Sequence, residues 1–348
     1  MPENKTASAS RRDFLLDRLK GIGILLVIFA HICHNGSFFF IFLFHMPLFF
    51  FLSGAALSYS KNLEFKTWKR FKRIMVPYFG FSVLCFAYWY FLESKFRPVR
   101  DVSIFSGILG SLNFRLQQLV NIPLAISYNE AFQYNVVLWF LPCLFVAILL
   151  FISIKRLMGQ YAPVGVLAAA VVGFLLRSTR LPWCLEISLI AVPFVWAGYS
   201  AYKYLKSGSW WIGLGTLAAS IVLVWIYNPR VDMRTHLYGN IFLFYAVALG
   251  LTVTLVFAGR VLAFKNVGVL AWLGRNSLTL MCLHGPVYRV VLGVGARILH
   301  MEMEALRGST LLSLGATLLT IGILVPVIMG LNKFLPELVG RERIARTN

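Results

Sequence analysis

Residues 17–54 have the sequence DRLKGIGILLVIFAHICHNGSFFFIFLFHMPLFFFLSG, in which two apolar runs flank the turn-forming residues Asn35, Gly36 and Ser37. A helix rises about 1.5 Å per residue and a bilayer core is about 30 Å thick. Each run is therefore close to the length that crosses a membrane. The pair predicts a transmembrane hairpin at the start of the chain.

Each half of this hairpin contains a histidine. At the rise of a helix, His31 lies roughly 16 Å beyond Lys20, and His45 lies roughly 10 Å below the turn, so both are expected at a similar depth. Ionisable side chains at such a depth are costly unless they face a cavity or a partner, which makes both functional candidates. The alternative for each is a packing role, with the ring hydrogen-bonded to a neighbouring helix.

The composition independently indicates an integral membrane protein. Hydrophobic residues make up 59% of the 348 residues, charged residues only 13%, and the mean hydropathy is +0.76. The net charge of +20 does not indicate nucleic-acid binding, because the cations lie in short segments between apolar runs. The five cysteines all lie in apolar runs and predict neither a disulfide framework nor a metal site.

Apolar runs of spanning length predict an all-α, polytopic protein with about ten transmembrane helices. The connecting segments on the N-terminal side hold 21 Lys and Arg residues against 11 on the other side, which predicts cytoplasmic termini and a multi-pass cytoplasmic (inner) membrane protein. We expect a cytoplasmic segment at 1–19, a membrane domain at 20–331 and a cytoplasmic tail at 332–348. The expected helices lie near residues 20–35, 38–57, 74–92, 135–154, 162–177, 184–202, 209–227, 238–258, 268–288 and 309–331.

The hairpin resembles the membrane-bound acyltransferase family 3, and within it fucose 4-O-acetylase and related sugar O-acetylases. Members carry a basic residue, ten residues and then a histidine on the first helix, a spacing that Lys20 and His31 meet. The second helix is similar to FHMPLFFFLSG at residues 44–54. Lys20 is a departure, since many members have arginine there, and lysine lacks the bidentate guanidinium.

Residues 66–78, KTWKRFKRIMVPY, carry a further similarity to the family. Arg70 and Arg73 share a helix face and have the planar guanidinium that suits phosphate. The resemblance implies that they bind the phosphates of acyl-coenzyme A. The neighbouring lysines are expected to be topogenic or to contact anionic lipid.

Two later segments are also similar to the family. In VLWFLP at residues 137–142, Trp139 is expected either in the interfacial aromatic belt or in the acceptor pocket. The predicted helix 268–288 carries LGRNSLTL and then His284 before a proline. Asn276 and His284 are expected to line the polar interior, and Arg275 to be a second phosphate contact.

The resemblance implies an O-acyltransferase that uses acyl-coenzyme A, most simply acetyl-coenzyme A, and no metal. Its acceptor would be a cell-envelope glycan or a lipid-linked sugar. His31 is the expected general base, with His45 nearby, while Asp17 or Lys20 would bind or orient at the cytoplasmic end. Direct attack and a transient acyl-histidine both remain possible. The sequence predicts no oligomeric state.

A polytopic transporter with buried histidines as proton relays is the alternative function, although no matched pair of broken helices supports it. The segment 93–134 is expected outside the membrane as a simple loop or as a lid over the acceptor site. Glu186 and Glu130 are expected to be solvated near helix ends, and His236 to lie in an external segment.

Overall fold

The computed structural model describes residues 13–59, 66–96, 104–105, 107–128, 131–227, 231–262 and 268–342. Parts of the predicted terminal segments, residues 1–12 and 343–348, lie outside these ranges, as does Glu130. Within them the chain is helical and contains no strand, only an isolated bridge between Asp232 and Leu237. The helices are α1 Phe14–Ile32, α2 Ile41–Leu57, α3 Thr67–Phe91, α4 Gly107–Gly110, α5 Phe114–Leu124, α6 Phe140–Met158, α7 Ala162–Leu175, α8 Leu185–Ser207, α9 Trp210–Tyr227, α10 Ile241–Leu262, α11 Gly268–Arg275, α12 Ser277–Ile298, α13 Met303–Gly308 and α14 Thr310–Phe334.

Seven helical stretches in the described chain are long and apolar enough to cross a membrane. One of them, residues 136–175, runs through both α6 and α7, and α9 is a shorter apolar helix. The all-helical membrane fold is thus confirmed, whereas the number of ten crossings and the side on which the termini lie stay predictions. The seven stretches are Gly36–Leu57, Thr67–Lys95, Val136–Leu175, Pro182–Ser207, Ile241–Arg260, Ser277–Ile298 and Thr310–Phe334.

The prediction of one continuous helix at 268–288 is wrong. It is divided at Asn276 into α11 and α12, and α12 continues past the predicted end at residue 288 to Ile298. Residue 274 is a glycine because a Cβ there would lie 1.7 Å from the main-chain oxygen of Asp17. Averaged hydropathy predicts neither the close packing of α11 on α1 nor the polar junction at Asn276.

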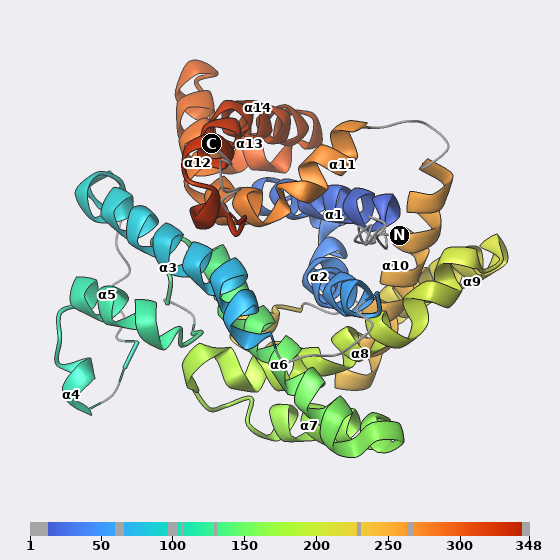
Figure 1. Cartoon of the computed structure of the whole chain (residues 1–348). Coiled ribbons are helices and arrows are strands. Elements are labelled where there is room, and N and C mark those ends of the chain that lie inside the picture. Colours follow the sequence, from blue (N-terminus) through green and yellow to red (C-terminus); the bar gives the residue numbers. More distant parts are fainter. Residues whose placement is uncertain are drawn as a thin grey trace, which may run out of the picture.

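The α1–α2 hairpin lies in the middle of the fold (Figure 1). Helices α11, α12 and α14 pack along α1, while α6, α8 and α10 pack along α2. In Figure 1 the first group lies above and beside α1, while α6, α7 and α8 lie below α2. Side chains of the hairpin therefore meet residues from both the middle and the end of the chain.

Helices α2 and α8 approach closely at two glycines. A Cβ on Gly54 would lie 1.9 Å from the Val195 oxygen, and a Cβ on Gly198 would lie 1.8 Å from the Phe51 oxygen. Small residues of this kind allow helix backbones to approach within a membrane. The two glycines set the position of α2, the helix that carries His45.

The described residues between α3 and α6 include the helices α4 and α5 and hydrogen bonds from buried side chains. The buried amides of Gln117 and Asn121 bond the main chain of this segment, and the Gln117 Oε1 accepts from Ile104 N at 2.7 Å. After α5 the chain enters the bundle, where Asn135 is fully buried and precedes the short 3-10 turn Val136–Trp139. This segment thereby contributes directly to the interior.

Candidate active site

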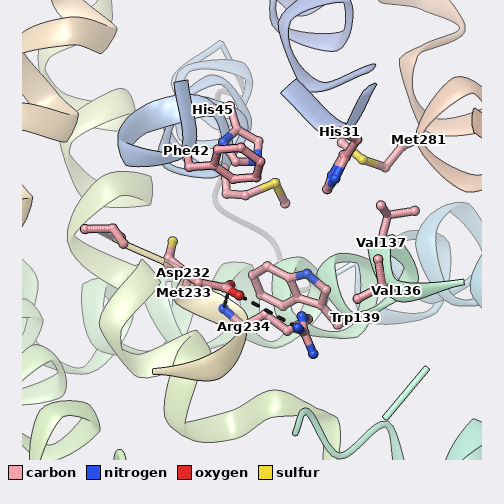
Figure 2. A pocket seen from close by; sticks show the side chains of 12 residues that line it. His31, Phe42, His45, Val136, Val137, Trp139, Asp232, Met233, Arg234 and Met281 are labelled. Carbon is pink, nitrogen blue, oxygen red and sulfur yellow. Dashed lines mark hydrogen bonds and ion pairs between the residues drawn. The ribbon is translucent and has the colours of Figure 1, made fainter. Parts of the chain in front are cut away.

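A cavity of about 240 Å³ lies where the α1–α2 hairpin faces two inter-helix segments. His31 lines it from α1, and Phe42, His45 and Met46 line it from α2. The opposite side comes from residues 136–139 and 231–234 (Figure 2). Met281 of α12 completes the lining. The cavity therefore joins residues that lie up to 250 positions apart in the sequence.

Three histidines converge beside this cavity. The His31 ring lies 6.3 Å from the His45 ring and 5.4 Å from the His284 ring, measured between centroids. Tyr288, one turn after His284, stacks parallel to His31 at 6.4 Å. His45 and His284 are buried, whereas His31 is partly exposed to the cavity. His31 is thus the member of the three that a ligand in the cavity can reach with the least displacement of protein.

Hydrogen bonds determine the tautomers of two of these rings. Nδ1 of His45 lies 2.9 Å from the Ile41 oxygen, and Nδ1 of His284 lies 2.9 Å from the Leu280 oxygen. A carbonyl only accepts, so each Nδ1 carries the proton and each Nε2 of the neutral ring has a lone pair. Nε2 of His284 is buried without a hydrogen-bond partner among the described residues. Both flanking rings therefore present proton acceptors in the interior.

Trp139, Asp232 and Arg234 form the opposite wall (Figure 2). Trp139 is buried, and its side chain lines the cavity. The guanidinium of Arg234 is 3.7 Å from the Asp232 carboxylate, and it donates a 2.9 Å hydrogen bond to the Tyr128 oxygen. A role of Trp139 in binding the acceptor stays a prediction.

The structure separates the remaining predicted residues from this cavity. Asp17 and Lys20 lie near the start of α1, roughly 16 to 21 Å along the helix from His31. Asn276 is at the α11–α12 junction close to Asp17, where its Oδ1 accepts from Arg341 at 2.8 Å and from Asn332 at 3.0 Å. Arg275 beside it is exposed. These residues belong to the opposite end of α1 and not to the histidine cavity.

Arg70 and Arg73 lie in the first two turns of α3, also outside the cavity lining. Arg73 is exposed and Arg70 is partly buried, so both guanidinium groups are near the molecular surface. Their roles, like those of the residues at the start of α1, stay predictions.

Two polar networks behind the cavity were not expected from the sequence. Asn135 donates to the Cys282 oxygen at 2.6 Å and lies against Gly285, beside His284. Nη2 of Arg289 donates to Oε2 of Glu93 at 2.8 Å and to the Tyr134 oxygen at 2.9 Å, and its Nε forms an ion pair with Oε1 of Glu93 at 2.7 Å. Their signal in the sequence is weak, because Glu93 falls in the segment expected outside the membrane and Arg289 follows the predicted end of the helix at residue 288.

The expectation that Glu186 is solvated is wrong. Its side chain is completely buried in α8, and its Oε1 is 3.4 Å from Nε2 of His236, which is itself largely buried. His236 belongs to the segment between α9 and α10, and this segment therefore reaches the first turn of α8. That contact spans 50 residues of sequence and could not be seen in a single helix.

The fold and this site define a multi-pass helical membrane protein with a histidine-lined cavity between its central hairpin and two inter-helix segments. The chain belongs to acyltransferase family 3, since the family's acyltransferase domain model matches residues 14–330. The protein is therefore an acyltransferase, and the family resemblance seen in its sequence is confirmed. No curated protein and no solved structure matched the chain. The family match supports the acyltransferase over the transporter alternative.

Proposed function

We propose that this protein transfers an acyl group, most simply acetyl, from cytoplasmic acyl-coenzyme A to a hydroxyl of a cell-envelope or lipid-linked sugar. His31 acts as the general base. The observation that carries this proposal is the exposure of His31 to a cavity that two other histidines flank. A neutral imidazole is suited to accept a hydroxyl proton near pH 7.

The reaction follows from this arrangement. His31 takes the proton of the acceptor hydroxyl while the hydroxyl oxygen attacks the carbonyl carbon of the thioester. The carbon–sulfur bond breaks, and the proton held by His31 passes to the departing coenzyme A sulfur. His31 could instead carry the acyl group for one step before the hydroxyl attacks, and the proximity of His45 is compatible with both routes.

The donor approaches from the cytoplasm in this account. Arg70 and Arg73 at the start of α3 bind its phosphates, with Arg275 as a further contact and with Asp17 and Lys20 orienting it near the start of α1. In this proposal ten helices cross the membrane, namely α1, α2, α3, α6, α7, α8, α9, α10, α12 and α14, so that both termini lie on one side, the cytoplasmic one. The excess of Lys and Arg on that side supports this orientation and a cytoplasmic (inner) membrane location.

The test uses membranes with and without the protein, incubated with acetyl-labelled coenzyme A and an extract of envelope glycans and lipid-linked sugars. We expect protein-dependent label that mild base releases as an ester. Propionyl- and myristoyl-labelled donors define the acyl preference. Uptake of unmodified label into closed vesicles, with no ester formed, would contradict the proposal and restore the transporter. Failure of the protein either to bind or to consume any of the three donors would also contradict it.

A further inference from the structure

We propose that Asp232 and Arg234, together with Trp139, form the acceptor subsite. This subsite binds a single sugar ring that carries no charged group. The inference rests on the proposed function and adds the residues and the chemistry that select its acceptor. Neither Asp232 nor Arg234 was a candidate from the sequence. Both face His31 and His45 across the cavity (Figure 2).

The size of the cavity limits what enters it. At about 240 Å³ it is smaller than the pockets that hold drug-sized ligands, which span roughly 300–1,000 Å³. One ring carrying the reacting hydroxyl suits this space, with the rest of a glycan or lipid outside it. The acyl carbonyl must share the same space, which further favours a single ring.

The charges of the wall select a neutral group. Arg234 alone would favour a carboxylate or phosphate on the acceptor. Asp232 stands 3.7 Å from that guanidinium, however, so the wall carries one charge of each sign. Sugar hydroxyls both donate and accept, and a neighbouring pair can donate to Asp232 while accepting from Arg234. An anionic ring would meet repulsion from Asp232.

The apolar lining suits the other face of such a ring. Trp139 supplies a large aromatic surface between the histidines and the polar pair, and Val136 and Val137 lie beside it. The C–H groups of a sugar ring pack against surfaces of this kind, while its hydroxyls reach the polar side chains at the edge. The wall therefore offers both contacts that a sugar ring requires.

Residues 232–237 form a loop that is rigidly held, as a binding site requires. Main-chain hydrogen bonds of 2.9 and 3.0 Å between Asp232 and Leu237 close it, and Ser127 donates to the Arg234 oxygen at 3.0 Å. From its far side His236 reaches the buried Glu186 of α8. The loop thus fixes the polar pair relative to the bundle before any acceptor arrives.

The experiment compares the wild type with Asp232→Asn and Arg234→Lys in membranes that supply labelled acetyl-coenzyme A and the cell's own acceptors. Asn preserves the acceptor that caps the turn at Arg234 N, at 2.9 Å, and Lys preserves the positive charge. We expect transfer at limiting acceptor to fall about 10- to 100-fold in each variant, the loss typical of one hydrogen bond to a charged group. The KM for acetyl-coenzyme A should stay within about twofold, since the proposed phosphate contacts Arg70 and Arg73 lie outside this cavity.

The matched controls are Arg177→Lys and Glu302→Gln, two exposed side chains outside the cavity lining, which should transfer at the wild-type rate. A second arm adds neutral methyl hexosides or the corresponding methyl hexuronates as competitors. The neutral compounds should compete with the acceptor for the wild-type protein at lower concentrations than the uronates do.

The outcomes separate this inference from the function on which it rests. Equal transfer by the wild type and both variants, or tighter competition by the uronates, would overturn the acceptor subsite alone. Absence of protein-dependent transfer in the wild type itself would contradict the proposed function, and the subsite with it.

Discussion

The guanidinium of Arg307 donates a 2.9 Å hydrogen bond from Nη2 to the main-chain oxygen of His31. Its Nε donates to the oxygen of Ile32 at 3.1 Å, and the same side chain contacts His34. These carbonyls lie at the C-terminal end of α1, where they have no intrahelical partner and where a cation is favourable. Arg307, which comes from the far end of the chain, therefore holds the helical turn that carries the proposed base.

Replacement of Arg307 by alanine should reduce acyl transfer about tenfold or more, because the last turn of α1 would lose two charge-assisted hydrogen bonds. The loss should appear in kcat, with the KM for acyl-coenzyme A little changed, since Arg307 lies near neither Arg70 nor Arg73. Arg297→Ala removes an exposed cation from the end of α12 and serves as the control. An unchanged kcat for Arg307→Ala would show that this turn keeps its geometry without the cap.

The glycines between α2 and α8 should tolerate no side chain. Gly198→Ala forces a methyl group against the Phe51 oxygen, and overpacking of this kind costs about 1–3 kcal/mol or more. We expect a lower Tm for purified protein in detergent. Gly315→Ala, in the interior of α14 with no atom near the added methyl, should leave the Tm unchanged or raise it. Equal Tm values for the two variants would contradict the close approach of α2 and α8.

The stability of the N-terminal end of α1 should depend on pH through Asp13. Burial acts to raise the pKa of this carboxyl, but hydrogen bonds from Tyr59 and Lys206 outweigh it and leave the pKa below its ordinary value. A lowered folded-state pKa gives stability that is fully present above the unfolded-state pKa of about 3.9 and is lost as the pH falls through the folded-state value.

Asp13→Asn keeps an N-cap acceptor for the main-chain N–H of Leu15 but removes this charge. The variant should be less stable than the wild type at pH 7, by up to about 1 kcal/mol, and the difference should shrink as the pH falls from about 5 to 3. Thermal melts across that range measure it. A difference that is the same at pH 3 and pH 7 would exclude the ionised carboxylate as the cause.

The ion pair of Arg289 with Glu93 should behave as a buried unit, because both side chains are almost completely buried. Arg289→Met leaves an uncompensated carboxylate and should cost about 3–5 kcal/mol. The double variant Glu93→Gln with Arg289→Met removes both charges and should regain part of that loss. The unfolding free energies of the wild type, Glu93→Gln, Arg289→Met and the double variant are measured in one detergent. A loss in the double variant equal to the sum of the two single losses would contradict direct coupling.

The sequence supported the class of fold and the hairpin, because long apolar runs and a histidine in each half are local features. It also anticipated that His31 and His45 lie at similar depth, and their rings are 6.3 Å apart. The sequence did not predict the division of the helix at Asn276, since averaged hydropathy does not register one polar residue between apolar neighbours. Close helix packing at Gly274 is likewise a tertiary property.

The far wall of the cavity could not be predicted for a different reason. Asp232 and Arg234 follow about 200 residues after His31, in a short connection without apolar periodicity. Only the fold brings that connection opposite the hairpin. Glu186 was misjudged for the same cause, because its partner His236 belongs to this connection and neither residue indicates the other in sequence.

The central claim, that His31 is the general base, is tested most directly by comparing His31→Gln with His300→Gln, a matched change at an exposed histidine outside the cavity. The measurement is the initial rate of base-labile ester formation from acetyl-labelled coenzyme A, with donor binding determined on the same membranes. Loss of a general base predicts a rate about 10²–10⁴ lower for His31→Gln, unchanged donor binding, and a wild-type rate for His300→Gln. A His31→Gln rate within a few-fold of the wild type would contradict the account.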